Sequence, residues 1–280
     1  MLSRPKWIRN KVLWSGNVNE MNEILRERKL KTVCVEAACP NRYECWSKRH
    51  VTFIILGNVC TRGCLFCNIM DGEAKSPDVS EPQKIAEAVK EIGAGYVVIT
   101  SVTRDDLKDG GADHFVKTVS AIKTISVDTT IELLIPDLNA DRDDLEKIVF
   151  SGASIIGHNI ETPECLYKDI RPHSDYKKSL NVLRILKEIK QKKGADVFVK
   201  SSMMLGLGEE NNDIIEALED LKSAGADIVY LGQYLAPTDK HWPVKKYYTP
   251  EEFEGFKQKA DEIGFKKVVA APMVRSSYRS

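Results

Sequence analysis

Residues 51–67, VTFIILGNVCTRGCLFC, run from an apolar segment into three closely spaced cysteines, Cys60, Cys64 and Cys67. The apolar and β-branched residues at its start are typical of a buried β-strand. The segment that follows spaces its thiols as C-x3-C-x2-C, where a dinucleotide-binding fold would have a glycine-rich turn. This stretch therefore predicts a strand that presents three thiols at its carboxyl end.

Six of the seven cysteines form two triplets, Cys34, Cys39 and Cys45 followed by Cys60, Cys64 and Cys67. Three thiolates can hold an iron-sulfur cluster and leave one iron without a protein sulfur. An open position of this kind is where a catalytic metal site binds its substrate. The two triplets therefore predict two clusters, each with one corner that cysteine does not fill.

Two other uses of the cysteines are weighed against clusters. Structural zinc needs four ligands, usually from two C-x2-C pairs, and neither triplet has that spacing, although six thiols together could form a binuclear zinc site. Disulfides are disfavoured because all six lie between positions 34 and 67 of a chain with an ordinary core. Cys165 stands alone and is expected to be a small, partly buried side chain.

Strand and helix patterns alternate after about residue 50. Strands are expected at 51–57, 95–100, 131–135, 153–156, 197–200, 227–231 and 267–269, and helices near 80–92, 111–125, 141–149, 177–192, 210–223 and 250–263. Such alternation builds parallel strands joined by right-handed crossovers, either in a doubly wound sheet or in a barrel. Because the dinucleotide fingerprint is absent, we predict an α/β fold, a partial (β/α)6-type TIM barrel of parallel strands.

The chain is divided into three parts. Residues 1–48 form an N-terminal extension that has a short helix at 18–30 and carries the first triplet. Residues 49–270 form the barrel, and residues 271–280 form a C-terminal tail. Because the irregular part of the extension cannot build a core of its own, we expect its cluster to serve as its cross-link.

Polar residues follow several of the expected strands. In barrels of this kind the active site is built from the loops at the carboxyl ends of the strands. We therefore select Thr103, Asn159, Lys200 and Gln233 as candidate cofactor contacts, although a polar residue after a strand is often only part of a turn. His158 is expected to be a packed histidine bonded to the backbone.

Composition limits the classes of function. Of 280 residues, 41 are Lys or Arg and 41 are Asp or Glu, so no net charge draws the protein to nucleic acid or to a lipid surface. The first residues lack the apolar core of a signal peptide, and no run of about 18 apolar residues occurs. The sequence thus predicts a cytoplasmic protein that binds neither nucleic acid nor membrane.

The second triplet, with Phe66 as its aromatic residue, matches the signature of the radical S-adenosylmethionine (SAM) superfamily. The first triplet, spaced C-x4-C-x5-C, resembles the auxiliary-cluster motif of the lipoyl synthase family. Val35 departs from that motif, in which an acidic residue is expected. Similar blocks extend along the whole chain: PKWIR at 5–9, CPN at 39–41, CTR at 60–62, VITSVTRDDL at 98–107, HNIET at 158–162, GLGE at 206–209, GQYL at 232–235 and RSSY at 275–278.

The resemblance implies lipoyl synthase activity, the radical insertion of two sulfur atoms at C6 and C8 of a protein-bound octanoyl-lysine. A 4Fe-4S cluster on Cys60, Cys64 and Cys67 would cleave SAM, and the resulting radical chemistry would belong to the cofactor. An auxiliary 4Fe-4S cluster on the first triplet would be consumed as the source of sulfur. Because methylene carbons offer nothing for a general base, no constellation of His, Asp and Ser is needed.

The same resemblance extends to the tail. The family's auxiliary cluster takes its fourth ligand from a serine of the RSSY motif, which corresponds to Ser277 here, with Ser276 as the fallback. An oxygen ligand binds iron more weakly than a thiolate, which suits a cluster that releases sulfide. Without the resemblance these residues would be interpreted as a frayed terminus. Arg275 is expected to orient the auxiliary cluster or the substrate.

The implied partners are octanoylated lipoyl-carrier proteins, such as the glycine-cleavage H protein and the acyltransferase subunit of a 2-oxo acid dehydrogenase. An electron donor of the ferredoxin or flavodoxin type is also implied. Two alternatives stay open, another dual-cluster radical SAM enzyme and a two-cluster electron carrier. The second of these would form no 5'-deoxyadenosine on reduction.

Overall fold

The computed structural model describes residues 3–8 and 15–279. Residues 1–2, 9–14 and 280 lie outside it, and they include Arg9 of the PKWIR block and the last residue of the predicted tail. Within the described part, one eight-stranded sheet has the order β1 (Lys31–Thr32), β2 (Val51–Ile55), β5 (Tyr96–Ser101), β6 (Thr130–Leu134), β7 (Ile155–Gly157), β8 (Phe198–Leu205), β9 (Ile228–Gln233) and β10 (Lys267–Ala271). Every neighbouring pair from β2 to β10 is parallel.

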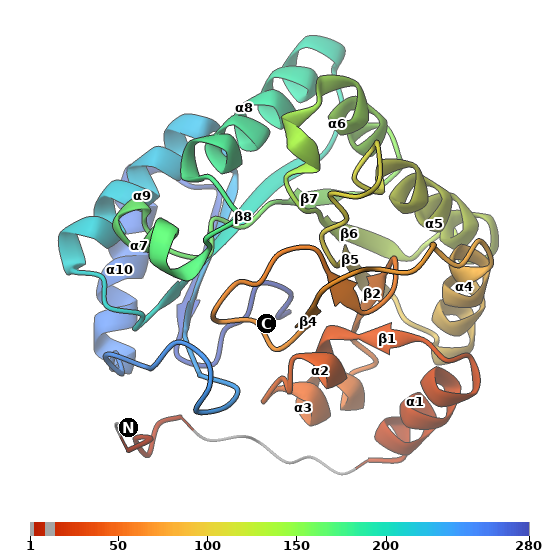
Figure 1. Cartoon of the computed structure of the whole chain (residues 1–280), viewed down its shortest axis with the longest axis horizontal. Coiled ribbons are helices and arrows are strands. Elements are labelled where there is room, and N and C mark those ends of the chain that lie inside the picture. The colour runs from red at the N-terminus through yellow and green to blue at the C-terminus, as the bar shows by residue number, and fades with distance from the viewer. Residues whose placement is uncertain (1–2, 9–14, 280) are drawn as a thin grey trace.

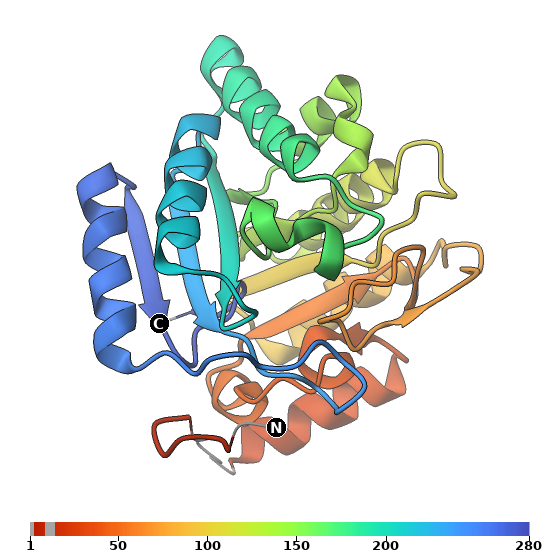
Figure 2. The same ribbon diagram turned by 60° about the vertical axis from the view of Figure 1, so that its left-hand side comes forward.

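Helices connect these strands, namely α4 (Glu81–Ile92), α5 (Ala112–Ile125), α6 (Arg142–Val149), α8 (Tyr176–Lys193), α9 (Asn211–Ala224) and α10 (Pro250–Ile263). They form an outer arc around the strands (Figure 1), and α8, α9 and α10 cover the outer side of β8, β9 and β10 (Figure 2). Among the described residues β1 and β10 are the edges of the sheet, so the barrel is open. The predicted α/β partial barrel is confirmed. Within residues 3–8 and 15–279, no helix is both long and apolar enough to cross a membrane.

Side chains along each strand point alternately to the outer face of the sheet and to the barrel interior. Val97 and Ile99 of β5 belong to the same core cluster as Phe115 of α5. Because successive side chains of a strand point to opposite faces, Tyr96 and Val98 point to the interior. Strand β2 is buried along its whole length, as expected for a parallel strand that is covered on both faces.

The N-terminal extension contains α1 (Gly16–Glu27), α2 (Val33–Glu36) and α3 (Arg42–Ser47). It lies at the open side of the arc of helices (Figure 1), and β1 pairs antiparallel with β2. The apolar residues of α1 belong to the main core cluster of the barrel. The extension therefore shares the core and the sheet of the barrel, in addition to the cross-link expected from its cluster.

Several elements differ from the sequence-based expectation. Strand β8 continues to Leu205, five residues beyond the predicted end at Lys200. The helix α7 (Glu164–Ile170) and the strand pair β3 (Val59–Cys60) and β4 (Met70–Asp71) were not predicted. The second half of β8 was not predicted because its polar residues Lys200, Ser201 and Ser202 suggest a turn. In the structure these residues are buried within the strand.

The tail is held between β9 and α3. The amide of Asn41 donates to the carbonyl oxygen of Met273 at 2.7 Å, and the hydroxyl of Tyr278 donates to Glu44 at 3.1 Å. Val274 is buried in a small apolar cluster with residues of β9. The alternative interpretation as a frayed terminus is therefore wrong for residues 272–279.

Candidate functional site

The cluster loop, residues 60–67, is fixed to two neighbouring segments through its backbone. The amide of Thr61 donates to the carbonyl oxygen of Thr103, which follows β5, at 3.1 Å. The amide of Leu65 donates to the carbonyl oxygen of Ile170, at the end of α7, at 2.9 Å. These bonds hold an irregular loop in a defined position at the carboxyl ends of the strands.

The thiols of the cluster loop have the surroundings of metal ligands. Backbone amides of Arg62 and Ile69 donate to Sγ of Cys60 and Cys67 at 3.4 and 3.5 Å. Burial and then the neighbouring thiolates raise the pKa of Cys67 to about 12, so the free thiol is protonated at neutral pH. Bound iron removes such protons, and hydrogen bonds to the sulfurs are typical of iron-sulfur sites. The loop therefore fits the predicted cluster.

A group of buried polar atoms lies beside this loop. The Asn159 amide donates to Glu161 at 3.0 Å, while its Oδ1 is buried and has no partner in the described part of the chain. Burial raises the pKa of Glu161, and Arg171 opposes that shift. Arg171 also faces Cys64, and its Nε is buried without a partner among residues 3–8 and 15–279. Unpaired buried groups of this kind fit a polar cofactor such as SAM.

The four candidate cofactor contacts have different surroundings. Thr103 lies against the cluster loop and Asn159 lies in the polar group just described. Lys200 is not at the rim, because it lies inside β8 and its Nζ donates to the buried carboxylate of Glu132 at 2.7 Å. The premise that Lys200 follows a strand is therefore wrong.

Gln233 ends β9, yet its side-chain amide is fully used. The two N–H groups of its Nε2 are shared among the carbonyl oxygens of Leu205, Tyr234 and Lys246, at 3.0, 3.1 and 2.9 Å, and its Oε1 accepts from the amide of Tyr248 at 2.9 Å. These bonds hold a loop and leave no donor for a cofactor. The sequence could not reveal this, because the loop returns from 13 residues further along the chain.

His158 is a packed histidine, as predicted. Its Nδ1 lies 3.0 Å from the carbonyl oxygen of Ile135. Burial lowers its pKa to about 4, so the ring is neutral at physiological pH.

Sequence reasoning missed Arg62 and Arg171 as site residues. Arg62 forms ion pairs with Asp105 and Asp137, which come from the loops after β5 and β6. Arg171 follows the unpredicted helix α7 and so had no strand to mark it. The only available signal was the position of Arg62 between two cysteines.

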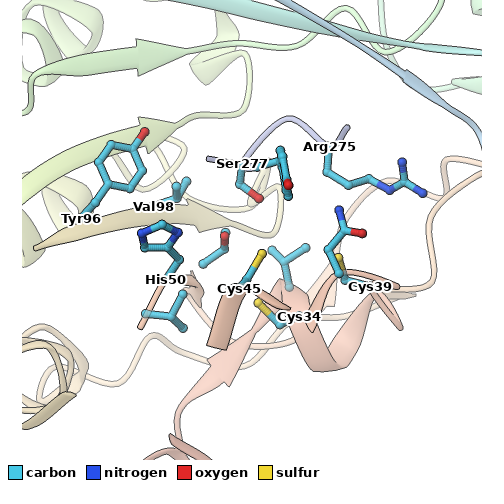
Figure 3. A pocket seen from close by; sticks show the side chains of 13 residues that line it. Cys34, Cys39, Cys45, His50, Tyr96, Val98, Arg275 and Ser277 are labelled. Atoms are coloured by element: carbon cyan, nitrogen blue, oxygen red, sulfur yellow. The ribbon is translucent and has the colours of Figure 1, made fainter. Parts of the chain in front are cut away.

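The first triplet lines a pocket at the opposite ends of the strands. Cys34 comes from α2, Cys39 from the turn that follows, and Cys45 from α3. Ser277 and Arg275 of the tail lie across the pocket from the three cysteines (Figure 3). Ser276 is not among the described residues that line it, so the geometry favours Ser277 as the fourth ligand.

The charges around this pocket suit an anionic group. Burial, followed by the charge of neighbouring thiolates, raises the pKa of Cys34 to about 11 and that of Cys45 to about 12. Nη1 of Arg275 donates to the carbonyl oxygen of Val274 at 2.6 Å, but its Nη2 is buried without a partner in the described chain. Since a buried guanidinium without an anion is costly, the pocket fits a cluster with thiolate and alkoxide ligands.

The cysteines of each triplet are not arranged around a single ion in the part of the chain that the structure describes. Within the described ranges, no three His, Cys, Asp or Glu side chains converge on one ion. Zinc would need its sulfur ligands about 2.3 Å from a single centre, whereas a cluster distributes its thiolates over several irons.

Comparison with known proteins assigns the chain to one family. A family model described as the radical SAM superfamily matches residues 54–221. The lipoyl synthase of Caldicellulosiruptor saccharolyticus is 46% identical over 275 residues, which cover 98% of this chain and 95% of that protein. The lipoyl synthase of Alkaliphilus metalliredigens is 46% identical over 277 residues, covering 99% and 94%. The chain belongs to the lipoyl synthase family.

Solved structures similar to this lipoyl synthase family member share its fold. Methylornithine synthase has a TM-score of 0.53 at 16% identity, covering 96% of this chain and 82% of that one. The FeFe-hydrogenase maturase of Carboxydothermus hydrogenoformans has a TM-score of 0.56 at 15% identity, covering 91% and 72%. Membership of the lipoyl synthase family also confirms the predicted cofactors, SAM and two 4Fe-4S clusters.

Proposed function

We propose that this protein inserts two sulfur atoms at C6 and C8 of an octanoyl-lysine on a carrier protein, giving lipoyl-lysine. The observation that carries this proposal is the pair of cysteine sites in one barrel, one on the rim loop after β2 and one in a pocket that Ser277 also lines. A single-cluster radical enzyme would need only the first of these. Similarity to lipoyl synthases along almost the whole chain supports the same conclusion.

When bound, the cluster on the cluster loop supplies the electron that cleaves SAM to a 5'-deoxyadenosyl radical, and the auxiliary cluster supplies the sulfur atoms. The protein's own part is to hold the reacting groups and exclude water. We assign Thr103, Asn159 and Arg171 to the SAM side of the barrel. Gln233 fixes the loop that closes this side, since each of its amide bonds goes to the backbone.

Lys200 is assigned a structural role in the barrel interior. Its ammonium group pairs with Glu132 and lies 3.9 Å from the centre of the Tyr230 ring. The hydroxyl of Tyr96 donates to the same carboxylate. The positive charge of Lys200 is balanced by the negative charge of Glu132, so neither side chain leaves an unpaired charge in the barrel interior.

Ser277→Cys is expected to retain the auxiliary cluster and to slow sulfur insertion. A thiolate binds iron more strongly than a serine oxygen, so it hinders the release of sulfide. The measurement is iron and sulfide content together with lipoyl product per SAM cleaved. Ser276→Cys is the matched control and should behave like the wild-type protein. Normal turnover in Ser277→Cys would contradict the assigned role.

The function is tested by anaerobic reconstitution followed by mass spectrometry of an octanoylated lysine peptide, with and without SAM. A product with two added sulfur atoms is the expected result. Formation of 5'-deoxyadenosine without sulfur insertion would favour another dual-cluster radical SAM enzyme. Reduction of the clusters without 5'-deoxyadenosine would favour an electron carrier.

The carrier substrates we propose are the glycine-cleavage H protein and the acyltransferase subunit of a 2-oxo acid dehydrogenase. The electron donor is proposed to be of the ferredoxin or flavodoxin type, and the protein is proposed to act in the cytoplasm. The balance of 41 basic and 41 acidic residues supports neither a nucleic-acid nor a membrane partner.

A further inference from the structure

The side chain of Arg62 is held by two carboxylates from separate loops. Its Nε and Nη2 donate to Asp105 at 2.9 and 2.7 Å, and its Nη1 and Nη2 donate to Asp137 at 2.6 and 3.0 Å. A planar guanidinium can make such two-point bonds on both sides, and an ammonium group cannot. One side chain therefore ties the cluster loop to the loops after β5 and β6.

Asp137 is itself fixed from its own side. Its Oδ1 also accepts from the amide of Asn139 at 3.1 Å, in the short helix η1 (Leu138–Ala140). The φ angles of these three residues are 44°, 53° and 54°, a left-handed conformation that non-glycine residues keep only where their surroundings hold them. Asp137 is therefore held by its own loop as well as by Arg62.

The backbone of Arg62 reaches one of the cluster ligands. Its amide donates to Sγ of Cys60 at 3.4 Å. The guanidinium and this N–H belong to the same residue, so the bonds to Asp105 and Asp137 restrict the positions that the Arg62 peptide can take. Hydrogen bonds to cluster sulfurs help to set the reduction potential of a cluster.

We propose that Arg62 is a positioning residue whose anchor on Asp105 and Asp137 holds its own N–H on the Cys60 sulfur and thereby sets the reduction potential of the cluster bound there. This proposal rests on the proposed function only in requiring a 4Fe-4S cluster on the cluster loop. An N–H bond to sulfur favours the more negatively charged, reduced state. Loosening the anchor therefore moves the midpoint potential to a more negative value.

Arg62→Lys tests the proposal in the reconstituted holoenzyme, since it keeps the charge and removes the two-point bonds. The readout is a redox titration followed by electron paramagnetic resonance, in which the change on adding SAM identifies this cluster. We expect a more negative midpoint potential at unchanged iron content, and a fall of about 10–100-fold in the rate of SAM cleavage. A midpoint potential equal to that of the wild-type protein would overturn the proposal.

Arg104→Lys is the matched control. Arg104 makes the same kind of bidentate pair, with Asp106 at 2.8 and 2.7 Å, and it is as deeply buried. No hydrogen bond in the described chain joins its amide to a cysteine sulfur, so its variant should leave the midpoint potential unchanged. An equal shift in both variants would mean general loosening of the rim and would overturn the proposal.

If the Arg62→Lys protein does not bind its cluster, the midpoint potential is measured in Asp105→Asn instead. The Asp105 side chain is 39% exposed, so its replacement buries no unpaired charge. We expect a smaller shift in the same direction, and an unchanged midpoint potential would overturn the proposal. Failure of the proposed function is a separate result, because it would be seen in the wild-type protein as missing lipoyl product while the potential remains measurable.

Discussion

Gly232→Ala is expected to displace the C-terminal tail and to stop sulfur insertion while SAM cleavage continues. Gly232 lies in β9, and a Cβ atom there would overlap the backbone carbonyl of Val274. A backbone segment cannot rotate out of the way as a flexible side chain can, so the tail must move. Ser277 and Arg275 would then leave the auxiliary pocket. We expect lipoyl formation to fall by about 100-fold, the upper end of the loss seen when the supporting contacts of a metal site are removed.

The matched control is Gly255→Ala in α10, where a Cβ atom would meet no other atom within 4 Å. That variant should keep both activities. The measurements are 5'-deoxyadenosine, lipoyl product and the iron content of each protein. Retention of full sulfur insertion by Gly232→Ala would show that the tail need not lie against β9.

Cys64→Ala is expected to lose both half-reactions, whereas Cys45→Ala is expected to lose only sulfur insertion. Loss of Cys64 removes one of three ligands of the cluster loop, so 5'-deoxyadenosine formation and all later steps should be lost. Loss of Cys45 removes a ligand of the auxiliary site, whose cysteines line a different pocket together with Ser277. That variant should still cleave SAM but should form no lipoyl product.

The measurement is single-turnover formation of 5'-deoxyadenosine and of thiolated peptide by each variant after anaerobic reconstitution. Cys165→Ala is the control, because Cys165 lies outside both triplets and is exposed, so the expectation that it is partly buried was wrong. Loss of SAM cleavage in Cys45→Ala would mean that the two sites do not act separately. Sulfur insertion by Cys64→Ala would contradict the assignment of the cluster loop.

Most of the barrel could be predicted from local patterns. The expected strand at 51–57 appears as β2, and the helices expected near 141–149 and 250–263 appear as α6 and α10. These elements were visible because a helix or a strand imposes its own period on neighbouring residues. Strand β8 was cut short because buried polar residues within a strand resemble a turn in the sequence.

The spacing of cysteines within each triplet, and the choice of iron over zinc, came from residues close together in the chain. The tertiary structure decided the rest, because the partners are far apart in sequence: Asn41 with Met273, Lys200 with Glu132, and Arg62 with Asp137. It also favoured Ser277 over Ser276, since only the path of the tail across β9 determines which hydroxyl reaches the pocket. Helices and strands follow from the pattern of neighbouring residues. The pairing of charges and cluster ligands depends instead on which distant segments of the chain the fold brings together.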